Sequence, residues 1–322
     1  MNIKTILIGL LITVVSQQLL AEFDFKYPRT TVEMKLQKVS EHVYFVQGIA
    51  GIATDNQGFI SNATAIIAND GVVIVDALGS PSLAEKFLSE LRKITQLPIT
   101  KVITTHYHAD HIYGLQTFTE TGAKLYAPEG VNQYLDSEAA TSRLEERRFS
   151  LEPWVNENTK LQFPDVIISE SQQIKQGDIT LTINYLGKAH SDGDLTVFVE
   201  QDGVFISGDV IFEGRIPFVG DADSKAWLET LNKMGKQDNI KALIPGHGSL
   251  AEDPESAITL TRNYLTFLRK HFAAGVEEMM TFDEIYSEID WKDFEHLPAF
   301  DFGNRTNAYQ LFLNLEQELL EN

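Results

Sequence analysis

The chain has 322 residues, 43% of them hydrophobic, which provides for a sizeable core and excludes general disorder. Its formal net charge of −20 repels phosphate backbones and anionic membrane surfaces, so nucleic acid is excluded as a partner. The absence of cysteine excludes disulfides, cysteine nucleophiles and thiolate metal ligands.

The first predicted element is a short apolar run at the N-terminus. Lys4 precedes an uncharged stretch from Ile6 to Val15, and Ala21 offers a cleavage position. This order is typical of a secretory signal peptide, and the apolar run is short for a membrane span. We expect residues 1–21 to be removed, no stable membrane insertion to remain, and the mature protein to be periplasmic or secreted.

The next segment predicts strands, then a helix, then another strand. Two apolar runs in NATAIIANDGVVIVDALG flank Asn69-Asp70-Gly71, which is a strong hairpin signal. The stretch SPSLAEKFLSELRKIT opens with Ser80 and Pro81 and carries apolar residues at helical spacing. The β-branched stretch ITKVITTH then predicts a strand that leads directly into a cluster of histidines.

The remaining chain repeats this alternation of strands and helices. DHIYGLQTFTETG predicts one helix ending at Gly122, AKLYAP predicts a strand, and residues 129–150 predict a helix. Residues from about 160 to 212 predict strands, SKAWLETLNKM a helix and IKALIPGHG a strand; the chain is predicted helical after about 254. Two such blocks predict a layered α/β architecture. The solvated face of helix 129–150 is expected to carry Arg143, Glu145, Glu146, Arg147 and Arg148.

The histidine cluster is TTHYHADH, residues 104–111. His106 and His108 follow a strand, and residues two apart in extended chain point the same way, so both imidazoles can reach one cation. Asp110 and His111 fall where a helix begins, so they project differently and can serve a second cation. A zinc ion takes three or four protein ligands, so further ligands must come from distant segments.

Three distant residues have the properties of such ligands. His190 lies in GKAHSDGD, Asp209 in FISGDVIF and His247 in LIPGHG, each after an apolar segment and beside glycine or small residues. Strand ends of this kind are expected to meet at one edge of a sheet. The other histidines do not occupy such positions and are interpreted as ordinary surface or packed residues: His42, His271 and His296.

These four motifs, in this order, resemble those of the metallo-β-lactamase superfamily over about residues 39–250. The likeness is greatest to glyoxalase II-like and quinoprotein-relay (sulfur-oxidation-associated) hydrolases. True class B β-lactamases match more loosely, and many of them use cysteine where this chain has Asp209. The resemblance implies a four-layer αββα sandwich over residues 22–254, with a helical C-terminal extension, residues 255–322, packed on the same domain.

The resemblance also implies a binuclear site. Asp209 would bridge two zinc ions, with iron or manganese as alternatives, and Asp76 would support the site from behind its ligands. Asp110 would act both as ligand and as catalytic proton handler. The implied function is an exported hydrolase that uses a metal-bridging hydroxide to cleave an ester, thioester, lactone or lactam bond of a small molecule, with weak or no β-lactam turnover. The ligands of the first metal would be His106, His108 and His190, and those of the second Asp110, His111 and His247.

Several interpretations stay open at this point. Two further functions compete: a mononuclear iron oxygenase acting on persulfides, using His106, His108 and either His190 or Asp209, and a non-catalytic periplasmic accessory module of a redox system. The helical extension either covers the pocket or forms a homodimer contact. Asp194 is either a turn residue or a support of the site, and Tyr113 either a core or a pocket residue. The loop after Asp209 is expected to form the pocket rim, with Arg215, Phe218 and Trp227 as candidates for substrate contact.

Overall fold

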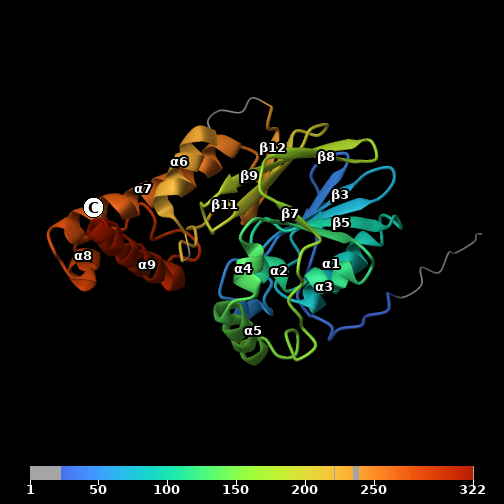
Figure 1. Cartoon of the computed structure of the whole chain (residues 1–322), viewed down its shortest axis with the longest axis horizontal. Coiled ribbons are helices and arrows are strands. Elements are labelled where there is room, and N and C mark those ends of the chain that lie inside the picture. Colours follow the sequence, from blue (N-terminus) through green and yellow to red (C-terminus); the bar gives the residue numbers. More distant parts are fainter. Residues whose placement is uncertain (1–22, 221, 235–238, 322) are drawn as a thin grey trace, which may run out of the picture.

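The computed structural model describes residues 23–220, 222–234 and 239–321 (Figure 1). The predicted signal peptide, residues 1–21, lies outside these ranges. Among the helices in them, none has both the length and the hydropathy that a bilayer crossing requires.

Within the described residues, the first sheet has seven strands in the order β1-β2-β3-β4-β5-β6-β7. Strands β1 to β4 pair antiparallel, and β4 to β7 pair parallel. The predicted hairpin at Asn69-Asp70-Gly71 is confirmed, because Ile67 pairs with Val72 across it. The strands are β1 (Leu36–Lys38), β2 (Val43–Val46), β3 (Ala63–Ile67), β4 (Val72–Val75), β5 (Ile99–Ile103), β6 (Lys124–Pro128) and β7 (Val166–Ile168).

The second sheet, counted over the same ranges, has five strands in the order β12-β11-β10-β9-β8. Strands β8 to β11 form an antiparallel meander, and β12 pairs parallel with β11. This parallel pairing brings the ends of β11 and β12 to the same edge, which is where the motifs SGD and PGH stand. The strands are β8 (Gln172–Gln176), β9 (Ile179–Gly187), β10 (Asp194–Val199), β11 (Val204–Phe212) and β12 (Ala242–His247).

Helices cover the outer face of each sheet (Figure 1). On the first sheet lie the short helix η1 (Ala53–Asn56) and the helices α1 (Pro81–Leu91), α2 (Ala109–Ile112), α3 (Leu115–Thr119), α4 (Val131–Leu135) and α5 (Glu138–Ser150). On the second lie α6 (Ser224–Met234) and α7 (Pro254–Glu277), and α8 (Phe282–Glu288) and α9 (Phe300–Glu321) pack on α7, so these helices gather at one end of the molecule.

Three buried apolar cores separate these layers. In β4, Ile74 packs toward the helices of the first sheet, whereas its neighbour Val73 packs between the sheets, because successive strand residues point to opposite faces. Phe212 of β11 packs with Tyr264 of α7 and Leu311 of α9 in the third core. The predicted four-layer αββα sandwich is therefore confirmed. The domain boundary at residue 254 stays a prediction, although the extension shares its core with the second sheet.

Two predicted helices are each broken in two. The helix expected to end at Gly122 divides into α2 and α3 at Gly114, where an added Cβ would overlap the carbonyl oxygen of Ala77. The backbone must therefore approach the segment after β4 closely at that point. Residues 129–150 divide into α4 and α5 because Ser137 starts a new helix, its side chain accepting a hydrogen bond from the Ala140 N–H.

Candidate metal centre

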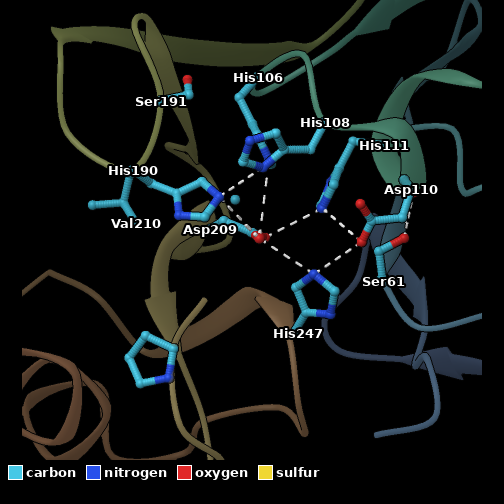
Figure 2. Close-up of polar contacts among 12 residues, drawn as sticks. Ser61, His106, His108, Asp110, His111, His190, Ser191, Asp209, Val210 and His247 are labelled. Carbon is cyan, nitrogen blue, oxygen red and sulfur yellow. Dashed lines mark hydrogen bonds and ion pairs between the residues drawn. The ribbon is translucent and has the colours of Figure 1, made fainter. Parts of the chain in front are cut away.

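The structure brings all seven predicted metal ligands together at one edge of the two sheets (Figure 2). They arrive from the segment after β5, the start of α2, the loop before β10, strand β11 and the end of β12. Within each of two groups, the potential ligand atoms lie within 4.8 Å of one another. The first group is His106, His108, His190 and Asp209, and the second is Asp110, His111 and His247.

In the first group, three imidazole nitrogens face one another. His108 Nδ1 lies 3.1 Å from His106 Nε2 and 2.9 Å from His190 Nε2. A neutral imidazole carries a single N–H, so three such nitrogens cannot all be satisfied by hydrogen bonds among themselves. Their lone pairs converge on one point, which is the arrangement that a cation with nitrogen ligands requires.

Asp209 lies between the two groups and contacts both (Figure 2). Its Oδ2 is 3.4 Å from His190 Nε2 and 3.2 Å from His247 Nε2, and its Oδ1 is 3.2 Å from His111 Nε2. Asp110 Oδ2 lies 3.1 Å from the same nitrogen of His247. Asp209 therefore occupies the place that a bridging carboxylate would need.

A hydrogen-bond chain behind the ligands sets which imidazole nitrogens face the centre. Asp76 accepts hydrogen bonds from the Thr105 N–H at 2.8 Å, from Thr105 Oγ1 at 2.9 Å and from His111 Nδ1 at 2.9 Å. Because the Thr105 hydroxyl donates its one hydrogen bond to Asp76, its oxygen accepts a hydrogen bond from the Nδ1–H of His106, at 3.0 Å. Both imidazoles are thereby held with Nε2 toward the centre, the nitrogen that a metal ion would take. This contact places Asp76 where the sequence led us to expect it.

The second sheet holds its ligand in the same way. His247 Nδ1 donates to the Ile60 carbonyl at 2.7 Å, which leaves Nε2 facing Asp110 and Asp209. Beside Ile60, the buried Asn62 donates through Nδ2 to the Pro245 carbonyl at 2.8 Å and to the Gly248 carbonyl at 3.0 Å. Asn62 thus ties β3 to the end of β12, a role that no local sequence pattern indicates.

Gly246 has a specific steric role at this point. A Cβ there would overlap Asp209 Oδ1, so a larger residue would displace the carboxylate from between the two groups. The glycine of the PGH motif is therefore needed for the close approach of β12 to β11.

The electrostatics of the centre favour a bound cation. Burial opposes ionisation of Asp209, but His247 and His111 outweigh it and hold the pKa of this carboxyl well below its ordinary value. Burial likewise acts to lower the pKa of His111, but Asp209, Asp76 and Asp110 together raise it well above the ordinary value. Three carboxylates, two of them buried, therefore attract positive charge, which here is supplied by protonated imidazole and which a metal ion can replace.

The imidazoles of the first group are already in the form that metals bind. Burial, reinforced by neighbouring His111, lowers the pKa of His106 well below its ordinary value, and burial lowers the pKa of His190 to about 3. Both are neutral at pH 7. His111 Nε2 and Asp209 Oδ1 are both buried and lie 3.2 Å apart, but neither atom has a partner with hydrogen-bond geometry. Orphaned buried donor atoms of the correct chemistry show that the residues present fit a metal centre.

A cavity of about 680 Å³ opens onto the centre. Its walls come from residues 51–54, from α5, from residues 215–218 and from the start of α9, which contributes Phe302, Gly303, Thr306 and Asn307. The helical extension therefore forms one wall of the cavity, the first of its two predicted roles. The face of α5 that was predicted to be solvated is not wholly directed at bulk water, because its Arg143 and Arg147 line the cavity.

The rim loop, residues 213–220, is clamped to the extension. The buried Asn307 of α9 accepts a hydrogen bond from the Val219 N–H at 3.0 Å and donates to the Pro217 carbonyl at 2.7 Å. Between these two points lies Phe218, whose ring centroid is 5.9 Å from that of His108. The extension thus sets the position of an aromatic side chain beside the metal centre.

The other candidates separate into lining and supporting residues. Arg215 and Phe218 line the cavity as expected. Trp227 does not: it is fully buried, donates to the Val210 carbonyl and packs its ring 5.2 Å from His190, so it supports that ligand from behind. Tyr113 is a core residue that also borders a small recess next to Asp110.

Asp194 is buried and is the first residue of β10, directly after the turn that follows His190. It accepts hydrogen bonds from the N–H and hydroxyl of Ser191, and burial raises its pKa to about 7. The three histidines set aside in the sequence stay outside both ligand groups: His42 pairs with Asp202 at 2.8 Å, His271 packs on Phe267, and His296 is exposed.

Comparisons with known proteins agree with this geometry. The profile of the metallo-beta-lactamase superfamily matches residues 56–247. Metallo-beta-lactamase IND-1 of Chryseobacterium indologenes is 21% identical over 210 residues, covering 64% of this chain and 77% of the relative. Metallo-beta-lactamase type 2 of Bacillus cereus is 24% identical over 196 residues, covering 60% of this chain and 68% of the relative.

Solved structures share the fold at low identity. A metallo-beta-lactamase from Pontibacter korlensis superposes with a TM-score of 0.59 at 18% identity, covering 73% of this chain and 99% of that one. The sec-alkylsulfatase Pisa1 from Pseudomonas sp. superposes with a TM-score of 0.71 at 18% identity, covering 87% of this chain but only 50% of the longer alkylsulfatase. The profile match spans more than half of the chain and ends at His247. The chain therefore belongs to the metallo-beta-lactamase superfamily and is a metal-dependent hydrolase.

Proposed function

We propose that this protein is an exported binuclear zinc hydrolase that cleaves an ester, thioester, lactone or lactam bond in a small molecule. The observation that carries the proposal is the position of Asp209. Its two carboxylate oxygens contact imidazoles of both ligand groups, at 3.2 to 3.4 Å. Each group has at least three nitrogen or oxygen donors, which is enough to hold one zinc ion.

A bound zinc pair would supply an activated water at neutral pH and polarise the bond under attack. The chain's own residues prepare for this chemistry. Asp76 and Thr105 orient two ligating imidazoles, and Phe218 covers the centre from the rim loop. The Asp110 side chain is 20% exposed, whereas that of Asp209 is 3% exposed. Asp110 is therefore the carboxylate that can reach both the centre and the substrate, and we assign it the transfer of the proton.

Two complete ligand groups favour this proposal over a mononuclear iron oxygenase. Such an oxygenase would need only His106, His108 and either His190 or Asp209, and would leave the second group without a role. Among the bonds named, lactam cleavage is expected to be weak, although the curated relatives are named as β-lactamases. Many class B β-lactamases carry cysteine at the position of Asp209, and this chain has none.

Metal analysis followed by a substrate panel tests the proposal. Protein purified from the periplasm without chelator should contain about two zinc ions per chain, start at Glu22 and hydrolyse at least one neutral ester or thioester. Asp209→Asn, which removes the negative charge between the groups, should lower both metal content and turnover. The exposed Asp136→Asn should change neither.

Each contrary outcome identifies an alternative. One iron per chain with oxygen-dependent turnover would identify the oxygenase. A fully metal-loaded protein that turns over no substrate would point to the accessory module. Efficient cleavage of a chromogenic cephalosporin would overturn the expectation on lactams.

A further inference from the structure

The cavity of the metal centre has positively charged walls, in a chain whose net charge is −20. Apart from the proposed ligands, the charged side chains that line it among the described residues are Arg143, Arg147 and Arg215. A guanidinium presents several N–H donors in one plane, a geometry that matches the oxygens of a carboxylate, sulfate or phosphate. Three of them around one cavity indicate an anionic ligand.

Helix α5 turns one face toward the cavity. Ala139, Arg143 and Arg147 all line it, and they are spaced four residues apart, which places them on one stripe of a helix. The small Ala139 leaves room beside the two longer side chains. The two arginines therefore act as a pair directed at the same space.

The pair is only partly neutralised by its own helix. Arg143 Nη1 and Arg147 Nε both lie 3.5 Å from the same oxygen of Glu146, which is too long for a strong charge-assisted hydrogen bond. One half-exposed carboxylate thus serves two guanidinium groups, so a net positive charge and further N–H donors remain at the α5 wall.

Arg215, on the rim loop, provides an independent observation. It is only 7% exposed, and in the described ranges it forms no ion pair with a carboxylate. Its Nε donates to the Ile216 carbonyl at 3.3 Å. Its Nη1 lies 3.4 Å from His247 Nδ1, a nitrogen that already donates to Ile60 and so cannot accept. Asp209 and Asp110 act on this cation only from beyond ion-pair distance, so an anionic ligand in the cavity would offset part of the cost of burying it.

The remaining cavity wall is largely apolar. Ile52, Ile216, Phe218 and Phe302 line it, and the last two side chains are 40% and 45% exposed. A ligand that fills the cavity therefore meets hydrophobic surface as well as guanidinium groups. We propose that the substrate of the hydrolase proposed above is an amphiphilic oxyanion: an apolar body that carries the scissile bond and, separately from it, a carboxylate, sulfate or phosphate group bound by Arg143 and Arg147.

Direct binding tests the subsite independently of catalysis. Calorimetric titration of the metal-loaded protein would use hexane-1-sulfonate, whose sulfonate is a weak metal ligand, and 1-hexanol as its uncharged counterpart. The double variant Arg143→Gln/Arg147→Gln should bind the sulfonate about tenfold more weakly, because two charge-assisted contacts are lost. Arg262→Gln, which removes the same charge on α7 away from the cavity, should bind it like the wild type. Equal sulfonate binding by the double variant, or no preference for sulfonate over hexanol in the wild type, overturns the subsite.

Turnover measurements then identify which anionic group the substrate carries. Three hexanoyl esters are compared whose alcohol portion ends in a carboxylate, a sulfonate or a neutral amide. The wild type should prefer one of the anionic esters by about tenfold in kcat/KM, and the double variant should lose that preference through a higher KM while keeping its kcat on the neutral ester. Intact sulfonate binding with no turnover of these esters or of the corresponding thioesters, lactones and lactams would overturn the proposed hydrolase and leave the anion subsite standing. Turnover of all three esters at equal rates would overturn the substrate class alone.

Discussion

At the scale of single residues, the chemistry of the centre depends on groups that do not themselves face the metal site. Asp76 has a backbone φ of +62°, a conformation that L-residues rarely adopt, and from it the carboxylate accepts three hydrogen bonds. Strain of this kind persists where the surrounding structure requires it. Here it allows one carboxylate to orient His111 directly and His106 through Thr105.

Asp76→Asn is expected to weaken metal binding. An asparagine has one acceptor oxygen where the aspartate has two, so its NH2 group must face either the Thr105 N–H or the pair formed by the Thr105 hydroxyl and His111 Nδ1. The loss of the negative charge also weakens the hold on His111. The apparent metal affinity should fall about 10- to 100-fold, as is typical when the partner of a ligating histidine is removed. Competition with a chromophoric chelator measures this, with Asp136→Asn as the control. An unchanged affinity would show that Asp76 serves the turn alone.

At the scale of elements, turns and loops join the two sheets around the site. Asp202, in the turn between β10 and β11, accepts hydrogen bonds from the Ser40 hydroxyl and from the His42 backbone N–H at 3.0 Å, just before β2 begins. Burial opposes ionisation of Asp202, but these hydrogen bonds outweigh it and lower its pKa from the ordinary value. The Asp202 carboxylate, in a turn of the second sheet, thereby fixes the segment that leads into β2 of the first sheet.

The contribution of Asp202 to stability should depend on pH. Because its pKa is lower in the folded than in the unfolded chain, the contribution is complete above the unfolded pKa of about 4 and is lost as the pH falls through the folded value. Asp202→Asn should lower the free energy of unfolding by about 2 kcal/mol at pH 7, and by less near pH 3. Urea unfolding at both pH values measures this difference, and the exposed Asp136→Asn serves as control. The same loss at both pH values would contradict the assignment.

The contact between α9 and the rim loop should affect substrate binding more than metal binding. Asn307→Leu keeps the branched shape of the side chain but leaves the Val219 N–H and the Pro217 carbonyl without their partner, so the rim loop and Phe218 should shift. We expect KM to rise several-fold with little change in zinc content. Gln317→Ala, on the exposed side of α9, is the matched control. Loss of zinc with unchanged KM would instead place the effect of Asn307 in the metal centre.

At the scale of the whole molecule, the C-terminal extension is part of both the core and the cavity. Tyr264, Leu268 and Leu311 of the extension are buried against Phe212 and Trp227 of the preceding domain. The side of the second sheet that faces them would otherwise expose large aromatic surfaces. The extension therefore both completes the fourth layer and supplies a wall of the cavity.

Removal of residues 255–322 should prevent stable folding, because the apolar outer face of the second sheet would lie open to water. The truncated chain is expected to be insoluble or to lose its cooperative thermal transition. A chain ending after Glu318 loses only the exposed Leu319, Leu320 and the last two residues, and should unfold like the full protein. A soluble, cooperatively folded chain ending at residue 254 would show that the extension is an independent unit.

Sequence patterns, together with the family resemblance, were sufficient for the order of strands and helices, the layered fold and the seven side chains that gather at one edge of the sheets. Hairpin and helix-start signals are local, and so is the histidine spacing after β5. The distant ligands could be predicted because each follows an apolar strand and carries its own short motif. The breaks at Gly114 and Ser137 were missed, because helical periodicity continues across them and only the packing of neighbouring segments interrupts it.

What the sequence by itself determined is thus the chemistry of the centre, since donor types and their order along the chain are covalent properties. Only the tertiary structure decided which partners orient those donors and which surfaces enclose them. Asp76 and Thr105, Asn62 and the end of β12, and Asn307 and the rim loop are far apart in the chain, and no local pattern encodes such pairs. The same holds for the α5 arginines, which charge patterning places on a solvated face and which the packing of α5 beside the metal centre turns toward the cavity.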